Sequence, residues 1–455
     1  MVKLKVISFT LFGFLFSGML IAQQDMMLYN VSQVPQSIYA NPALIPETRL
    51  NVSLFSNGLL QAGKSRFHTT DAFFRDDDGR LFLVGREMID SFQDRNTFRM
   101  NGSADIIHLG FEAGLNYIHF NITEHGGFNL DFPKDASILL REVYEQNFLG
   151  QNIVVENLQF NINHYREFGV GFARRLSNRI TVGGKLKYLQ GVGHFSTNEN
   201  SFQVNTDTEE FNENNTISGA LAFSAQSAGL NGYRTAGSAT DLVLRGGNKG
   251  FAADLGVNFD VTSFLSVSGA VQNLGGFINW GREVRNFEQP NRDLTVNLFE
   301  LPEAIDTEGS RSTEIRGQVE SLVDSLMGDE GSENSTSFST RIPTVVNLSV
   351  ALNVSNALTF TFLNQNIFIE ELDNMHFLKV MMQAKLKRSL TAIVAYDLIN
   401  NQTPAANLGL GIAVNLSAFQ LYALTEDILF ISNTNDRVSG SIRFGVNFTF
   451  GRDNL

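Results

Sequence analysis

Histidine and acidic residues are the side chains of this sequence best suited to chemistry, and their spacing argues against a metal site. The seven histidines stand singly, without the pairing that places two ligands on one helix face. Asp76, Asp77, Asp78 and Gly79 resemble the start of a calcium loop. However, Phe74 breaks the alternate-residue spacing of the ligands and no Glu closes the loop, so we expect an ordinary polar turn. The histidines are His68, His108, His119, His125, His164, His194 and His376.

Glycine motifs are also present, but they lack the setting that a nucleotide or nucleophile site needs. The runs Gly169-Val-Gly171 and Gly191-Val-Gly193 have no third glycine and no strand-to-helix transition, so they do not predict dinucleotide binding. No G-x-S-x-G elbow of a serine hydrolase occurs. The sequence therefore predicts a protein that is not an enzyme and that uses no cofactor and no metal.

The N-terminus predicts export from the cytoplasm. Lys3 and Lys5 precede an apolar run that ends at Ala22, a small residue of the kind found before a cleavage site. We expect residues 1–22 to be a cleaved signal peptide. The alternative is a membrane anchor helix, although a run of about 17 residues is short for crossing a bilayer. Since the chain has no cysteine, it has no disulfide, no thiolate metal site and no cysteine-linked lipid anchor.

Composition narrows the class of protein further. Hydrophobic residues make up 43% of the chain but form no second long apolar run, which excludes a helical membrane protein and leaves a globular domain or a barrel. The 34 basic and 47 acidic residues give a net charge of −13. Because binding to phosphates needs a basic face, we expect no nucleic-acid partner.

Strict alternation of apolar with small or polar residues is the main structural signal. Apolar side chains occupy every second position from 442 to 450, with Gly or polar residues between them. Such runs often reach about nine to eleven residues, which suits a tilted membrane-crossing strand better than a strand of a soluble sheet. The strands of a soluble β-sandwich would show a similar alternation of apolar and polar residues. However, the non-apolar face of these strands carries mostly Gly, Ala, Ser and Asn, which favours a barrel lumen. The same pattern recurs at residues 158–173, 180–188, 251–259, 265–272, 346–353 and 408–416.

Connection lengths predict the orientation of this barrel. Short turns near residues 177–178, 261–262, 355–356, 387–388 and 417 alternate with long connections at about residues 60–100, 124–150, 274–340 and 425–438. Outer-membrane barrels have short periplasmic turns and long extracellular loops, so both termini lie in the periplasm and the number of strands is even. We count 16 candidate strands, of which the pair around residues 195–224 is weak. The expected fold is an all-β transmembrane antiparallel barrel of about 14 strands (14 to 16) at residues 49–451.

Two of the long loops are predicted to carry helices. Residues 132–146 begin with Pro133 in the first turn, and residues 313–327 repeat an apolar stripe at helical spacing. We expect both stripes to pack on the barrel rim, with docking of a partner as the alternative. The acidic stretch at residues 207–215 reads as a solvated loop.

A short motif ahead of the first strand resembles a known family of barrels. Asn41-Pro42-Ala43 resembles the Asn-Pro-Ala element of the long-chain fatty-acid outer-membrane transporter superfamily. Other runs are similar to a Bacteroidota branch of it, near barrel proteins associated with type IX secretion. These runs are Phe132-Pro-Lys-Asp135, residues 184–191, Gln272-Asn-Leu-Gly275 with Trp280, and residues 444–450.

The resemblance implies a 14-stranded barrel whose lumen is plugged by a hatch at residues 23–48. Pro42 has a fixed φ and restricts Asn41, so Asn41, Pro42 and Ala43 would form a rigid bend from the hatch into the wall. The alternative is a plain turn before the strand, because Pro and Asn are common turn residues. The large helix-bearing loops depart from the transporters, and no ligand-binding residue can be matched.

Two functions remain open at this stage. One is an envelope or secretion-associated interaction barrel, which would contact outer-membrane lipid and a secreted or envelope protein through its loops. The other is a passive transporter or pore for a hydrophobic or amphiphilic small molecule. Because the inward positions read mostly as Gly, Ala, Ser and Asn, we favour the interaction barrel. The expected lumen contacts are Lys185, Lys187, Phe377, Lys379 and Met381.

Overall fold

The computed structural model describes most of the chain. Four predicted features lie outside the described residues, namely the signal peptide at 1–22, the polar turn at 76–79, the acidic stretch at 207–215 and the helix at 313–327. Of the helix expected at 132–146, only residues 134–136 are described as helical. The described ranges are 26–65, 74–75, 81–82, 90–136, 152–205, 216–230, 247–297, 336–369, 374–387, 389–400, 407–432 and 439–452.

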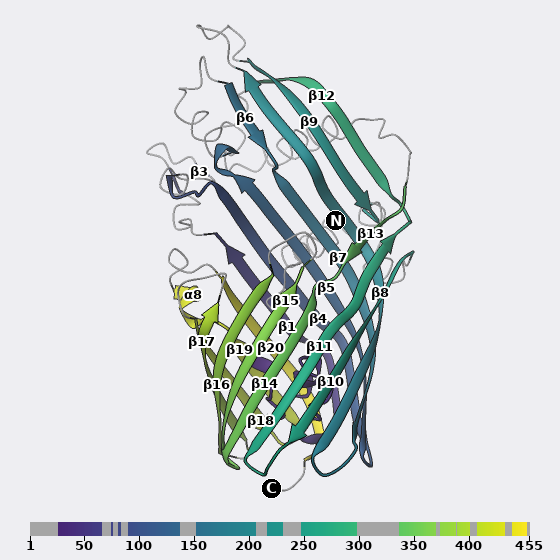
Figure 1. Cartoon of the computed structure of the whole chain (residues 1–455), viewed down its shortest axis with the longest axis vertical. Coiled ribbons are helices and arrows are strands. Elements are labelled where there is room, and N and C mark those ends of the chain that lie inside the picture. The colour runs from purple at the N-terminus through teal and green to yellow at the C-terminus, as the bar shows by residue number, and fades with distance from the viewer. Residues whose placement is uncertain are drawn as a thin grey trace, which may run out of the picture.

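Fourteen antiparallel strands form a closed barrel (Figure 1). The ring closes at β1, which pairs with β4 on one side and with β20 on the other. The lower of the two predicted strand numbers is therefore confirmed. In ring order the strands are β1 (Thr48–Lys64), β4 (Arg95–Ala113), β5 (Asn116–Pro133), β7 (Gln159–Arg175), β8 (Ile180–Asn205), β10 (Asn248–Asp260), β11 (Leu265–Trp280), β14 (Thr344–Ser355), β15 (Leu358–Phe368), β16 (Met375–Lys387), β17 (Leu390–Asn400), β18 (Leu408–Leu416), β19 (Phe419–Thr425) and β20 (Ser439–Arg452).

The weak strand pair around residues 195–224 does not belong to the wall, so the count of 16 was wrong. β8 continues past the barrel to Asn205, where it pairs with β9 (Thr216–Ala228), and β9 pairs in turn with β12 (Arg285–Asn297). These strands extend beyond the end of the barrel opposite the C-terminus (Figure 1). A sheet outside the membrane has the same two-residue period as a wall strand, so alternation alone could not separate the two.

The remaining elements are short. Beside the projecting sheet, β6 (Asn152–Glu156) pairs with β8, and β13 (Phe338–Arg341) pairs with β11. A small hairpin of β2 (Phe74–Arg75) and β3 (Leu81–Phe82) and the helix α8 (Ile428–Ser432) complete the described elements beyond the barrel interior. Among the described residues, no helix has the length and hydropathy to cross a membrane.

The two faces of the wall have the predicted parity. Leu348 has 57% of its surface exposed on the outside, whereas its neighbour Ser349 has 3% and faces the interior. Leu186 has 73% of its surface exposed on the outside and lies between the buried residues Lys185 and Lys187. Large apolar side chains on the outer face are what a lipid-facing band requires. The sequence-based assignment of the outward and inward faces is thus confirmed.

The two ends of the barrel differ as predicted. Turns of two to four residues join β4 to β5, β7 to β8, β10 to β11, β14 to β15 and β18 to β19, all at the end where the C-terminus lies (Figure 1). The longer connections lie at the opposite end. Two of them are shorter than expected because β1 extends to Lys64, β4 begins at Arg95 and β5 extends to Pro133.

Candidate functional site

The N-terminal segment, residues 26–47, runs through the interior of the barrel (Figure 1). Two 3-10 turns shape it, η1 (Met26–Leu28) and η2 (Pro35–Tyr39). Pro35 stands at the start of η2, where its fixed φ suits a first turn. The segment is anchored on opposite sides of the lumen, because β11 lies half-way round the ring from β20. Its hydrogen bonds join Gln36 to Asn447 of β20 (2.8 Å), Tyr29 to Ser268 of β11 (2.8 Å) and Tyr39 to His108 of β4 (2.8 Å).

Asn41 fixes the bend that leads out of this segment. Its Oδ1 accepts a hydrogen bond from the backbone N–H of Ala43 at 2.9 Å, which closes a local turn around Pro42. Its Nδ2 donates to the Tyr29 hydroxyl at 3.0 Å and lies 3.4 Å from the carbonyl oxygen of Gly269. Both ends of the fully buried amide are therefore used, one within the turn and one toward the wall.

Two wall glycines make room for this bend. Gly183 of β8 and Gly256 of β10 are direct register partners. A Cβ at Gly183 would collide with the carbonyl oxygen of Pro42, and a Cβ at Gly256 would collide with Oδ1 of Asn41. The bend therefore fits into a hollow that exists because neither glycine has a side chain.

A buried ion cluster holds the start of the N-terminal segment. Glu426 accepts hydrogen bonds from the backbone N–H groups of Met26 (2.7 Å) and Met27 (3.2 Å). Lys379 of β16 pairs with Glu426 and also lies 3.1 Å from Asp397 of β17. Because all three charged side chains are at most 5% exposed, this cluster is insulated from solvent screening.

A second, more exposed ion pair holds the other end of the segment. Lys385 of β16 lies 2.6 Å from Glu47, which also accepts a hydrogen bond from the hydroxyl of Ser32 at 2.8 Å. Both charged side chains are about a quarter exposed, at 25% and 27%. Exposed pairs of this kind contribute less than buried ones.

Apolar residues of the wall pack against the N-terminal segment, contrary to the expected composition of the lumen. Phe377 and Met381 of β16 belong to a buried cluster with Met26 and Met27 of the segment. The inward positions were predicted to be mostly Gly, Ala, Ser and Asn, and on this side of the barrel that prediction was wrong. Strands such as β15 carry apolar residues at both parities, and of the inward apolar residues only Phe377 and Met381 were expected. Further inward members are Val345, Leu363, Ile367, Ile393 and Leu424.

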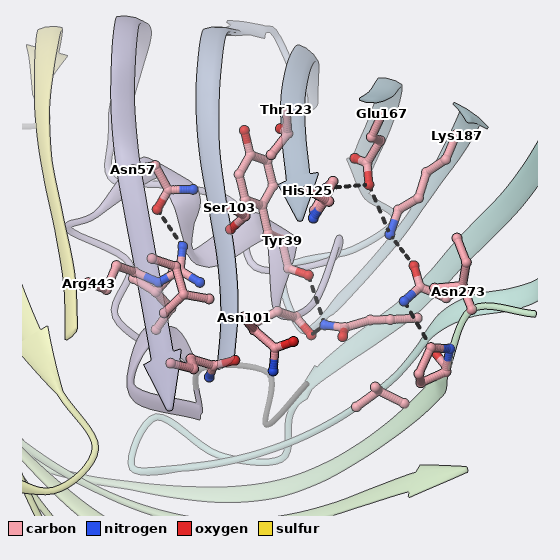
Figure 2. A pocket seen from close by; sticks show the side chains of 18 of the residues that line it. Tyr39, Asn57, Asn101, Ser103, Thr123, His125, Glu167, Lys187, Asn273 and Arg443 are labelled. Atoms are coloured by element: carbon pink, nitrogen blue, oxygen red, sulfur yellow. Dashed lines mark hydrogen bonds and ion pairs between the residues drawn. The ribbon is translucent and has the colours of Figure 1, made fainter. Parts of the chain in front are cut away.

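A cavity of 140 Å³, here the outer cavity, lies on the side of the segment away from the short turns. Charged residues from two neighbouring strands, β7 and β8, line part of its wall (Figure 2). Lys185 lies 2.6 Å from Glu167 of β7, while Lys187 lies 2.8 Å from Asp254 of β10 and 3.7 Å from Glu167. Since every one of these charges is buried and paired, the cluster is close to neutral as a unit.

Uncharged polar side chains make up much of the remaining lining of the outer cavity. In Figure 2, Asn101, Ser103 and Thr123 are drawn on the cavity lining together with Asn57, which accepts a hydrogen bond from Arg443 at 2.5 Å. The imidazole of His125 stacks on the ring of Tyr165, with centroids 4.7 Å apart. Apolar lining residues are Leu28, Leu59, Ile342 and Val345.

A second cavity lies on the other side of the segment, at the end that we expect to face the periplasm, and is here called the periplasmic cavity. It has a volume of 280 Å³ and is lined by wall residues near the short turns, including Arg175, Thr181 and Asn353. The N-terminal segment lines both cavities with different residues. It supplies Met26, Leu28, Tyr29, Tyr39 and Ala40 to the outer cavity and Asn30, Ser32, Ala43, Leu44 and Ile45 to the periplasmic one.

All eight residues singled out in the sequence lie in or against the barrel interior. Lys185 and Lys187 line the outer cavity, whereas Phe377, Lys379 and Met381 contact the start of the N-terminal segment or its anchor. Sequence reasoning missed the carboxylates that neutralise these lysines, which are Glu167, Asp254, Asp397 and Glu426. Each lysine that was predicted to point inward could have indicated a nearby carboxylate, because a buried charge needs a partner of opposite charge.

Two buried histidines lie beside this site. His108 and His119 have ring centroids 6.1 Å apart, and Tyr39 bonds to His108. They do not form a larger ligand set: in the described part of the chain, no group of three or more His, Cys, Asp or Glu side chains is placed to hold a metal ion.

Solved structures with a similar overall shape are outer-membrane proteins of low sequence identity. The toluene transporter TbuX of Ralstonia pickettii is 9% identical, with 92% of this chain and 94% of that chain covered and a TM-score of 0.48. A FadL homologue of Pseudomonas aeruginosa is 9% identical over 94% and 96% of the two chains, with a TM-score of 0.42. The toluene transporter TodX of Pseudomonas putida is 9% identical over 95% of each chain, with a TM-score of 0.40. Similarity at this level says nothing about the ligand of this chain.

Sequence comparison gives a family but no activity. No curated protein matches the chain. A family model described as "Family of unknown function (DUF5723)" matches residues 42–426, which include Pro42 and Ala43 of the bend, the wall glycines and the ion clusters. The chain therefore belongs to this family of unknown function, DUF5723.

Proposed function

We propose that this protein is an outer-membrane transporter or pore for a small amphiphilic molecule, and that residues 26–47 act as its hatch. The observation that carries the proposal is that one segment forms a wall of both cavities, which have no lining residue in common. A molecule that passes from the outer to the periplasmic cavity would have to displace this segment. The segment also has a more exposed anchor at Glu47 and a buried anchor at Glu426, so its periplasmic end would move more easily.

The composition of the interior supports transport over docking alone. One argument for an interaction barrel was the scarcity of inward apolar residues, and that argument fails for β15, β16 and β19. The outer cavity combines apolar residues such as Leu28 and Val345 with polar and charged ones such as Asn101 and Lys187. An amphiphilic molecule could use both kinds of surface.

Flux measurements with and without the hatch test this proposal. Purified protein is reconstituted in planar bilayers and in liposomes, and single-channel conductance and uptake of labelled octanoate are compared with those of a variant lacking residues 26–40. We expect a closed or weakly conducting wild type, octanoate uptake above that of empty liposomes, and a higher conductance in the deletion variant. The folded variant should still migrate differently from the boiled one on a gel. Equal conductance in wild type and a folded deletion variant would contradict the hatch.

The proposed start of the mature chain is tested separately. Cleavage after Ala22 would leave residues 23–25 ahead of Met26, whose backbone N–H is bonded to Glu426. The intact mass of protein purified from outer membranes should correspond to residues 23–455. A mass that includes residues 1–22 would contradict the signal peptide.

Docking of an envelope or secreted protein is a second candidate function. The observation that favours it is the sheet of β6, β8, β9 and β12, which projects beyond the barrel on one side (Figure 1). The motif resemblance to barrels near type IX secretion points the same way. Cross-linking in intact outer membranes should then capture one reproducible partner, and deletion of residues 310–328 should abolish the capture. A stoichiometric co-purified small molecule without any protein partner would argue against this function.

A further inference from the structure

We infer that the outer cavity binds a small neutral polyhydroxylated molecule, such as a monosaccharide or a cyclic polyol. This inference rests on the proposed function, because it assumes that the lumen admits a ligand, and it specifies the class of that ligand. It follows from three features of the lining: compensated charge, buried amide oxygens without donors, and apolar patches beside polar ones.

The charged groups around the outer cavity neutralise one another. Lys185 and Lys187 are paired with Glu167 and Asp254 at distances of 2.6 to 3.7 Å. The buried carboxylate of Asp105 interacts electrostatically with Lys185 and with Arg443, the third cation near the cavity. Three cations therefore face three carboxylates. A charged ligand would have to lose its hydration without gaining an unpaired counter-charge, so a neutral ligand is favoured.

Two buried glutamines offer hydrogen-bond acceptors to such a ligand. Gln272 of β11 donates its Nε2 to the carbonyl oxygens of Tyr39 (2.8 Å) and Ala40 (2.5 Å), and Gln365 of β15 donates its Nε2 to Asn347 at 3.0 Å. The Oε1 atoms of both side chains have no donor among the described residues, although each residue is at most 2% exposed. A buried acceptor without a donor is unfavourable. Because each oxygen has almost no exposed surface, its amide would turn slightly toward the cavity to accept a hydrogen bond from a ligand hydroxyl.

Hydroxyl and amide groups on the facing wall complete a hydrogen-bonding surface. Ser103 and Thr123 present hydroxyls, which can both donate and accept, and Asn101 presents an amide (Figure 2). A polyol carries donors and acceptors on the same oxygen atoms and suits this mixture. A hydrocarbon would leave these groups unpaired, and sites built for hydrogen bonding strongly reject analogues that lack the bonding groups.

Apolar and aromatic surfaces lie beside these polar groups. Leu28, Ile342 and Val345 line the same cavity. His125 keeps 24% of its side chain exposed while stacking on Tyr165. A sugar ring has hydrogen-bonding edges and C–H faces, so it can contact both kinds of surface at once.

Equilibrium binding in a detergent that contains no sugar tests the inference. The full-length mature protein in dimethyldodecylamine oxide is titrated by calorimetry with D-glucose, D-galactose and myo-inositol, and with the charged ring analogues D-glucosamine and D-glucuronate. We expect at least one neutral compound to bind, and the charged analogue of the same shape to bind about tenfold more weakly, which is about 1.4 kcal/mol. Binding of a charged analogue as tightly as its neutral parent would overturn the inference.

Matched substitutions separate the outer cavity from the rest of the lumen. Gln365→Leu and the smaller change Ser103→Ala should each weaken binding of the neutral compound by about five- to tenfold, the usual effect of one lost hydrogen bond. Gln383→Leu and Ser266→Ala make the same changes in the periplasmic cavity and should leave binding unchanged. Migration of unboiled protein on a gel shows that each variant is folded. Equal weakening by the control variants would overturn the assignment to the outer cavity.

The proposed function and this inference fail in different ways. Binding or uptake of octanoate or toluene, together with no binding of any neutral polyol at millimolar concentration, would overturn the inference and leave transport intact. Conductance that does not depend on residues 26–40 would contradict the hatch, even if a polyol binds.

Discussion

Gly183 and Gly256 are register partners on neighbouring strands, and the turn at Asn41 and Pro42 occupies the space that their missing side chains leave. The position of the N-terminal segment therefore depends on two residues of the wall and not only on its own sequence. None of the motifs that carry the resemblance to transporter barrels includes Gly183 or Gly256. These two glycines of the wall provide the space into which the Asn-Pro-Ala motif fits.

Gly183→Ala should displace the N-terminal segment without unfolding the barrel, because the added Cβ would collide with the carbonyl oxygen of Pro42. We expect a higher single-channel conductance with unchanged migration of the unboiled protein. Gly184→Ala is the matched control, since its added Cβ would have no neighbour closer than 3.5 Å. If both variants conduct like the wild type, Gly183 does not hold the bend.

Substitutions at two adjacent residues of β14 should have different effects. Leu348→Arg places a charge on the lipid face, which costs about 2–4 kcal/mol near the middle of the membrane, and should lower the yield of folded barrel. Ser349→Arg points inward, where the hydroxyl of Ser349 contacts Ser268 (3.0 Å) and the amide of Asn30 (3.3 Å). That variant should fold but loosen the N-terminal segment. Folding yield and conductance measure the two effects, and equal yields would contradict the assignment of faces.

The two anchors of the N-terminal segment should differ in strength. Lys379→Met leaves the buried carboxylates of Asp397 and Glu426 without their cation, and breaking a buried pair typically costs about 3–5 kcal/mol. Lys385→Met removes the partner of Glu47 in a more exposed pair and should cost no more than about 1 kcal/mol. Urea unfolding in lipid vesicles measures both free energies. Equal losses would mean that burial does not decide the contribution of these pairs.

The fold could be predicted from sequence further than the site could. Lipid requires an apolar side chain at every second wall position, so residues such as Leu348 and Leu410 fixed the membrane face directly. The ends of β8 could not be predicted, because its alternation continues outside the membrane to Asn205. The pairing of Lys187 with Asp254 depends on the register between β8 and β10, and no local pattern specifies that register.

The inward apolar cluster also escaped prediction. Val345 and Leu363 stand next to outward-facing apolar residues, so their strands read as one-sided although the inward face also carries apolar residues among its polar ones. Their inward role depends on Met26 and Met27, which lie more than 300 residues earlier in the chain. The closed barrel brings these strands into contact with a segment that is remote in sequence, so the sequence of the strand alone does not reveal the contact.

Asn41→Asp should destabilise the bend although it changes only one atom of the side chain. The carboxylate could still accept from the N–H of Ala43, but it could not donate to the Tyr29 hydroxyl or toward the carbonyl oxygen of Gly269. Instead, a negative charge would lie buried against a carbonyl oxygen, which disfavours the native position. Hydrogen exchange at the backbone amides of residues 37–44 should become at least about tenfold faster, a change of about 1.4 kcal/mol in local opening.

Asn30→Asp is the control for that substitution. The amide of Asn30 makes only longer bonds, at 3.3 Å to Ser349 and 3.4 Å to Thr361, and its side chain borders the periplasmic cavity, where a charge can be hydrated. We therefore expect its effect on exchange at residues 37–44 to be small. Similar acceleration by both variants would show that charge inside the lumen, and not the two-sided hydrogen bonding of Asn41, controls the stability of the bend.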